Sequence, residues 1–246
     1  MREITVKRSV LLNIFMRSLT IQSSFNFGRM QNLGFAFAML PLIRSGEGDR
    51  RRMAAPLARH LQMFNTHPYL AAPVIGAVVK LEENGRGEEA DHLKKVLMGP
   101  YAAIGDPFFW GALRTLSAAA AVILAFQGYL AAPLAFLLLY NPAHLWIRGK
   151  GFWEGYRRGK EGIAFIRGQD LPALGGRIRV LSLILIGILA ATAADTVWRS
   201  LTFPAEFTLK IAALSLILLY FLAVRRGISS AGILYGTALL CMALSI

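Results

Sequence analysis

The sequence predicts an all-α polytopic membrane protein with an N-terminal amphipathic surface helix, broken or re-entrant helices, and then three or four transmembrane helices. The first observation is composition: 55% of the 246 residues are hydrophobic and 17% are charged, against about 25% charged in an average soluble domain. The second is a mean hydropathy of +0.49, which is too apolar for a soluble protein of this length. The third is that the basic residues gather in loops between apolar runs, as in cytoplasmic loops that face anionic headgroups.

The net charge of +13 fits this class. In a soluble protein it would suggest nucleic-acid binding, but the sequence contains no nucleic-acid-binding motif. We therefore assign the charge to the lipid bilayer and expect no nucleic-acid partner. The single cysteine, Cys241, permits neither an internal disulfide nor a cysteine-based metal site. No cofactor and no metal are expected.

Residues 1–23 are expected to form the amphipathic helix. Their apolar residues recur at helical spacing, and Arg8 and Arg17 lie elsewhere on the helical wheel. The segment lacks a long apolar core that ends in a small-residue cleavage site, so it is not a signal peptide. The apolar residues in question are Val10, Leu11, Ile14, Phe15 and Leu19.

Residues 24–147 are expected to form a membrane-embedded core of broken helices. Three of its segments are moderately apolar but rich in Gly and Pro, which is typical of broken helices or re-entrant hairpins: 25–43, 61–81 and 96–112. "HPYLAAPVIGAVV" from His67 and "GPYAAIGDPFFWGAL" from Gly99 resemble each other. They are either two hairpin tips of an internal repeat or a chance likeness. The stretch 115–141 is one kinked span or two shorter crossings.

Residues 148–177 form a basic segment, and 178–246 contain the clearest spans, at 178–194, 208–224 and 230–246. If the basic segment and Arg226 lie in the cytoplasm, the first span crosses outward, the second crosses back inward and the third crosses outward again. The sequence therefore predicts a multi-pass membrane protein with its C-terminus outside.

Asp106 is the most unusual polar residue, because it lies between Gly105 and Pro107 in an apolar, aromatic stretch. We expect the helix to break here. Inserting an ionised carboxylate at membrane depth costs about 2.5–3.5 kcal/mol on insertion scales. Because of this cost, such a residue is by default taken to have a function. The alternative is that Asp106 caps a helix that begins at Pro107. Both roles can hold together.

Three further residues are candidates for contact with a transported substrate. Asn65 and His67 flank another expected helix break and offer an amide and an imidazole group. The alternative is that both side chains only form hydrogen bonds with backbone groups left unpaired at the break. Trp110 can stack on a ring of a substrate or act as a packing or interfacial anchor. His60 lies on the same helical face as His67, but no third ligand lies nearby, so a metal site is not expected.

Two basic groups are candidates for contact with soluble partners. Arg50, Arg51 and Arg52 either face lipid headgroups and cytoplasm or form a docking surface for an acidic partner protein. Arg157 and Arg158 stand beside Trp153 and Tyr156 at an expected cytoplasmic interface and suit either role.

Four blocks carry a family resemblance: "SFNFGRMQNLGFAFAMLPLI" (24–43), "HLQMFNTHPYLAAPVIGAVVKLEE" (60–83), "VLMGPYAAIGDPFFWGALR" (96–114) and "GFWEGYRRGKEG" (151–162). Together they resemble the IID component of the mannose/fructose/sorbose family of the bacterial sugar phosphotransferase system, over roughly residues 10 to 165. Beyond them the likeness is only that of apolar helices. The connection 195–207 is shorter than is common in that family.

The resemblance implies a hetero-oligomeric sugar permease, in which this chain and a IIC membrane subunit translocate a hexose-type sugar. Soluble IIA and IIB phosphocarriers would dock on the cytoplasmic face and supply the phosphoryl group. The chain itself would be a transporter subunit and not an enzyme, which agrees with the absence of a phosphate-binding loop motif.

Two other functions remain open. The first is a non-transporting membrane scaffold or regulatory subunit derived from such a permease, which the short C-terminal half favours. The second is a membrane enzyme acting on lipid-linked sugars, which the lack of paired carboxylates near a membrane face disfavours.

Overall fold

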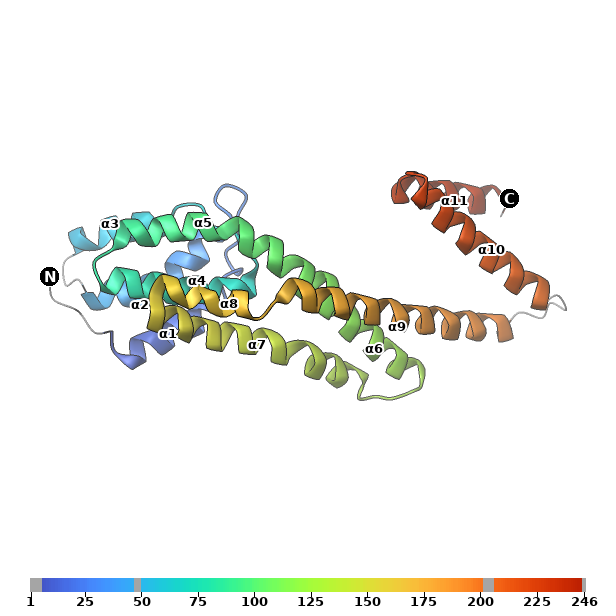
Figure 1. Ribbon diagram of the computed structural model, residues 1–246, viewed down its shortest axis with the longest axis horizontal. Helices are drawn as coiled ribbons and strands as arrows, with labels where there is room; N and C mark the ends of the chain where they lie inside the picture. Colours follow the sequence, from blue (N-terminus) through green and yellow to red (C-terminus); the bar gives the residue numbers. More distant parts are fainter. Residues whose placement is uncertain (1–5, 47–49, 201–205, 245–246) are drawn as a thin grey trace. The chain divides into compact units, whose positions relative to one another are not determined.

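The computed structural model describes residues 6–46, 50–200 and 206–244 (Figure 1). Within these ranges the regular structure is helical, with only two isolated β-bridges, so the predicted all-α class is confirmed. The chain divides into two compact units, Met1–Leu189 and Ala190–Ile246.

The first unit contains most of the helices. They are α1 (Arg8–Ser18), α2 (Asn32–Gly46), α3 (Arg50–His60), α4 (Pro68–Glu83), α5 (Gly87–Gly105), the π-helix η1 (Asp106–Leu113), α6 (Arg114–Phe126), α7 (Ala132–Arg158), the 3-10 helix η2 (Gly159–Ile163) and α8 (Ala164–Gly168). Helix α9 (Leu171–Ser200) begins in the first unit and passes into the second, which also holds α10 (Glu206–Arg225) and α11 (Ser230–Leu244).

Helix α4 is the centre of the first unit. It begins at Pro68, whose missing N–H suits a first turn, and nearly all of its apolar side chains are buried. It contacts α7 most extensively, and small residues make that approach possible. A Cβ on Gly76 would lie 2.2 Å from the carbonyl oxygen of Phe152, and one on Gly155 would lie 2.4 Å from that of Pro73. Only glycine permits backbones this close.

Helix α1 has its apolar face against protein. Leu11 and Ile14 are buried in the hydrophobic core, while Leu12 and Met16 remain exposed. The helix contacts α2 and, less extensively, α4. The predicted periodicity is therefore present in α1, and the side chains on its apolar face fill the core of the first unit.

The helix break expected at Gly105–Pro107 is wrong. Helices α5, η1 and α6 form one helical stretch of 40 residues, Gly87–Phe126, and Asp106 has helical φ and ψ angles of −61° and −49°. Because Asp106 lies inside this stretch, it does not cap a helix at Pro107. The π-helical turns of η1 begin here, and their i→i+5 pattern accommodates the missing N–H and the ring of Pro107.

The two similar segments also differ in structure. Pro68 begins α4 with His67 as N-cap, whereas Pro100 lies inside α5. They are therefore not equivalent hairpin tips.

The stretch 115–141 forms two helices, α6 and α7, joined by a turn at 127–131. Gly128 adopts a φ of +84° in this turn, a conformation that L side chains rarely adopt. Two described stretches are long and apolar enough to cross a bilayer, Gly87–Phe126 and Ala132–Thr196, and a shorter apolar helix covers Leu214–Arg225.

Candidate functional site

His67 lies at the centre of an aromatic cluster between α4, η1 and α7. Its ring stacks on Phe109 with centroids 4.8 Å apart, and Trp110 lies at the same distance on a tilted plane. Gly105 makes this contact possible, because a Cβ there would lie 2.3 Å from the Cβ of His67. The start of α4 is therefore fixed directly against η1.

Tyr69 connects the cluster to α7. Its hydroxyl lies 3.0 Å from that of Tyr140, and its ring stacks on His144 with centroids 4.4 Å apart. The guanidinium carbon of Arg148 lies 4.6 Å from the centre of the same ring, a favourable cation–π geometry. His67, Tyr69, Phe109, Trp110, Tyr140, His144 and Arg148 are called the aromatic cluster below.

Several polar atoms of the aromatic cluster are buried without a partner in the described chain. His67 accepts a hydrogen bond from the Tyr69 N–H at Nδ1, which leaves Nε2 to carry the proton, and Nε2 has no partner. Arg148 donates from Nη1 to the Leu19 carbonyl at 3.4 Å, but its Nε is also unpartnered. Buried donors are normally satisfied, so these N–H groups are suited to bind a hydroxyl-bearing ligand or ordered water.

The structure brings two of the predicted sugar-contact residues, His67 and Trp110, together, and the other two are close to them in the sequence. His67 and Trp110 belong to the aromatic cluster. Asn65 is half-buried just before α4, with its backbone N–H on the sulfur of Met98. Asp106 is half-buried four residues before Trp110, and within the described residues no hydrogen bond or ion pair involves its carboxylate.

Sequence reasoning missed part of the aromatic cluster. Tyr69 was visible only as part of the Pro-Tyr likeness between two segments, and Tyr140, His144 and Arg148 were not singled out. One signal was available: these three residues follow each other at four-residue spacing, which places them on one face of a helix.

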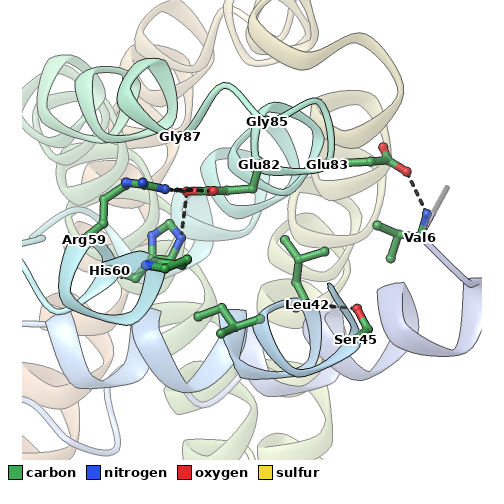
Figure 2. Close-up of a pocket in the computed structure, with 11 residues that line it drawn as sticks. Val6, Leu42, Ser45, Arg59, His60, Glu82, Glu83, Gly85 and Gly87 are labelled. Carbon is green, nitrogen blue, oxygen red and sulfur yellow. Dashed lines mark hydrogen bonds and ion pairs between the residues drawn. The ribbon is translucent and has the colours of Figure 1, made fainter. Parts of the chain in front are cut away.

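A second polar site lines a cavity of about 250 Å³ between α2, α3 and α4 (Figure 2). Arg59 and His60 of α3 both point to Glu82 of α4. Nη1 of Arg59 lies 2.6 and 2.9 Å from the two carboxylate oxygens, and Nε2 of His60 lies 3.1 Å from Oε1. On the far side of the cavity, Glu83 accepts a hydrogen bond from the N–H of Val6 at 2.7 Å.

Burial sets the protonation of this second site. It lowers the pKa of His60 below its ordinary value of 6.5, because the charged form would lose its hydration. Burial alone would raise the pKa of Glu82, but contact with His60 and the hydrogen bonds from Arg59 hold it below the ordinary value. The result is a neutral His60 beside an ionised Glu82 that pairs with Arg59.

The predicted docking arginines differ in their surroundings. The side chains of Arg157 and Arg158 are both exposed, and that of Arg158 also pairs with Glu154 at 3.1 Å. Arg50, Arg51 and Arg52 begin α3, but their side chains lie outside the described part of the chain. Among the described residues, no group of three or more metal-ligating side chains comes together.

Comparison with known proteins agrees with this architecture. The sequence profile of the mannose/fructose/sorbose family IID component of the phosphotransferase system matches residues 5–246, so the family likeness extends through the C-terminal helices as well. The chain is 40% identical over 190 residues to the mannose-specific EIID component of Escherichia coli K12, covering 74% of this chain and 67% of that protein. It is 34% identical over 209 residues to the fructose permease IID component of Bacillus subtilis, covering 82% and 74%.

Solved structures give the same result. A chain in the cryo-EM structure of the mannose transporter ManYZ with microcin E492 matches with a TM-score of 0.60 at 29% identity, over 97% of this chain and 96% of that one. A structure described as a membrane protein matches with a TM-score of 0.72 at the same identity and coverage. With the apolar helices and the profile match, these likenesses confirm the resemblance: the chain belongs to the mannose/fructose/sorbose family of phosphotransferase-system IID components, the membrane subunits of sugar permeases.

Proposed function

We propose that this IID subunit, together with a IIC membrane subunit, moves a hexose-type sugar across the bacterial inner membrane. Soluble IIA and IIB carriers then phosphorylate the sugar at the cytoplasmic face. Family membership supports the assembly, since relatives are named for mannose, fructose and sorbose. The phosphoryl transfer is assigned to the carriers on the strength of the family resemblance, and the lack of a phosphate-binding loop motif in this sequence agrees with that assignment.

The observation that carries the sugar-binding role is an unpaired carboxylate, Asp106, in the same π-helical stretch as Trp110, whose ring packs against His67 in the aromatic cluster. Asp106 supplies an acceptor for sugar hydroxyls, Trp110 a face for the ring, and His67 a donor at Nε2. Asn65 lies two residues before His67 and adds an amide. Hydrogen bonds to a charged acceptor contribute about 1.5–3 kcal/mol each, which corresponds to tenfold or more in affinity.

Uptake of radiolabelled sugar tests this role in cells that express the complete permease. Asp106→Asn keeps the size and helical fit of the side chain but removes its charge, so we expect at least tenfold weaker uptake per assembled complex. Glu88→Gln is the matched control, because Glu88 is an exposed carboxylate in the first turn of α5. Unchanged uptake by Asp106→Asn would exclude the carboxylate from the sugar site. A wild-type complex that assembles but carries no sugar would favour the scaffold function.

The proposed orientation places the basic segment in the cytoplasm and the C-terminus outside. Arg157 and the arginines at the start of α3 then offer positive charge to acidic carriers, while the pairing of Arg158 with Glu154 leaves it less available. An alkaline-phosphatase fusion at the C-terminus should be active and one after Arg226 inactive. The reverse pattern would overturn both the orientation and the docking face.

A further inference from the structure

An open furrow between α6 and α9 is the feature that the proposed sugar site does not explain. It has a volume of about 340 Å³ and begins at Trp110 and Arg114. From there it runs past Ala118 and Val122 of α6, with Ile186 of α9 on its other side. These five residues are called the furrow below, and all of them lie within the first unit.

The wall of the furrow is apolar beyond its charged end. Helix α6 contains a run of alanines at 118–121, and their small side chains leave space beside Val122 and Ile186, which are 40% and 41% exposed. The hydroxyl of Thr115, which also lines the furrow, donates to the carbonyl of Gly111 at 3.0 Å, so its hydrogen bond is made on its own helical stretch. A hydrocarbon chain can therefore cover this wall without burying an unpaired hydroxyl.

Arg114 lies at membrane depth. From Arg114 to Phe126, α6 has 13 residues, which span about 20 Å at about 1.5 Å per residue. The hydrocarbon core is about 30 Å thick, so with the turn 127–131 at one edge, the backbone of Arg114 lies inside the other edge. Its side chain reaches back toward that second edge, since its guanidinium carbon lies 6.0 Å from the centre of the Trp110 ring, one turn earlier. The basic segment lies on this side, because α7 runs back from the turn alongside α6 (Figure 1).

The charge of Arg114 is not balanced by an acid within the described chain. Its side chain is exposed, and among the described residues no hydrogen bond or ion pair involves its guanidinium. A cation at membrane depth is costly unless it pairs with an anion. A guanidinium binds phosphate with two parallel hydrogen bonds, and a neighbouring tryptophan is typical of the headgroup level. Arg114 is therefore suited to an anion from outside this chain, and lipid phosphate lies at the depth that its side chain reaches.

We propose that the furrow binds one anionic phospholipid from the leaflet that borders the basic segment. The lipid phosphate pairs with Arg114, and one acyl chain lies along Ala118, Val122 and Ile186. Charge and shape argue for this occupant, because a cation at the end of an apolar furrow matches a molecule with one charged head and a hydrocarbon tail. The neighbouring basic segment attracts anionic lipid to the same leaflet. In the proposed orientation this is the cytoplasmic leaflet, and the binding does not depend on a sugar-binding role of Asp106.

Photo-crosslinking of the complete permease tests the proposal in nanodiscs with equal parts of phosphatidylglycerol and phosphatidylcholine. Benzoyl-phenylalanine replaces Val122, and mass spectrometry identifies the adducts. The control position is Leu218 of α10, an apolar side chain that is 56% exposed. The ratio of phosphatidylglycerol to phosphatidylcholine adducts should be about fivefold higher at position 122, the preference expected from one arginine near an anionic headgroup. Equal ratios, or an adduct with the IIC subunit or a second copy of this chain in place of lipid, would overturn the proposal.

Charge variants identify the residue that causes this preference. Arg114→Gln should lower the ratio at position 122 to the value at position 218, because the amide carries no charge. Arg225→Gln is the matched control, since Arg225 is also exposed and its guanidinium carbon lies 5.8 Å from the centre of the Phe221 ring. This control should leave the ratio unchanged. An unchanged ratio in Arg114→Gln, or an equal fall in both variants, would contradict the assignment.

Two further measurements separate the acyl chain from the headgroup. Ala118→Leu fills the furrow and should lower the yield of phosphatidylglycerol adducts at position 122. Ala120→Leu should not, because Ala120 is equally half-buried but does not line the furrow. Excess glycerol phosphate, which has the charge of the headgroup without acyl chains, should not compete. Full yield in Ala118→Leu, or loss of the adducts with glycerol phosphate, would show that the site does not hold a lipid chain.

Discussion

Helices α4 and α10 have similarly apolar compositions and opposite surroundings. In α4 nearly every apolar side chain is buried by the rest of the chain, whereas in α10 most described apolar side chains are exposed, among them Leu214, Ile217 and Leu218. Helix α4 contains two prolines, a glycine and several alanines; α10 contains neither proline nor glycine. Small residues let backbones approach closely, so they mark the helix that packs against protein, while bulky leucines mark the helix that presents its sides to its surroundings.

The largest contrast is expected for truncated leucines. Leu70→Ala in α4 leaves a cavity at a fully buried site, and such substitutions cost about 2–5 kcal/mol. Leu218→Ala in α10 removes a side chain that is 56% exposed and should change stability far less. The thermal unfolding midpoint of the purified complex measures both. Equal losses would show that the two helices do not differ in packing as proposed.

A glycine pair sharpens the same comparison at smaller scale. Gly76→Ala forces a Cβ against the backbone of Phe152 and should destabilise by about 1–3 kcal/mol. Gly187→Ala in α9 meets no atom within 4 Å and should be neutral or slightly stabilising, because alanine favours helix. A stable Gly76→Ala complex would contradict the close approach of α4 to α7.

Protonation distinguishes the two regions further, since His60 and Glu82 lie in the first unit. The folded pKa of His60 is lowered by burial, so the unfolded chain binds more protons below its ordinary value of 6.5. Stability should therefore be complete above about pH 6.5 and fall as the pH drops. Glu82, whose folded pKa is also lowered, adds a loss in the same direction at lower pH, below about 4.5.

The measurement is the unfolding midpoint between about pH 7.5 and 5, in wild type and in His60→Gln. The wild-type midpoint should fall over this range. The unfolding midpoint of His60→Gln at pH 7.5 should be lower than that of the wild type, because the substitution disturbs the contact with Glu82. This midpoint should also change less with pH. Identical pH profiles would show that His60 does not titrate as inferred.

The smallest expected effect concerns two tyrosine hydroxyls. Tyr69 bonds to Tyr140 between α4 and α7, and Tyr220 bonds to Thr237 between α10 and α11. Tyr69→Phe should cost about 1 kcal/mol; Tyr220→Phe should cost about 0.6 kcal/mol, the average for hydrogen bonds between membrane helices. Unfolding midpoints of the single variants provide the comparison, and a larger loss from Tyr220→Phe would reverse the assigned order.

The sequence by itself determined the class of the protein. Its apolar runs and basic loops predict an all-helical membrane protein, because a segment that crosses lipid must form its backbone hydrogen bonds within itself, as a helix does. The four blocks determined the family, and the chemistry of the residues within those blocks selected His67, Trp110, Asn65 and Asp106 as candidates. These conclusions follow from local composition and order, which do not depend on how distant segments meet.

Only the tertiary structure decided how the irregular segments are built. Proline and glycine around Asp106 predicted a break, but the π-helical turns of η1 and its packing against His67 keep the helix continuous. Tyr140, His144 and Arg148 joined the candidate site because α7 lies against α4, a contact set by glycines far apart in the chain. Long-range packing overrides local propensity, and for that reason the sequence could name the groups but not their arrangement.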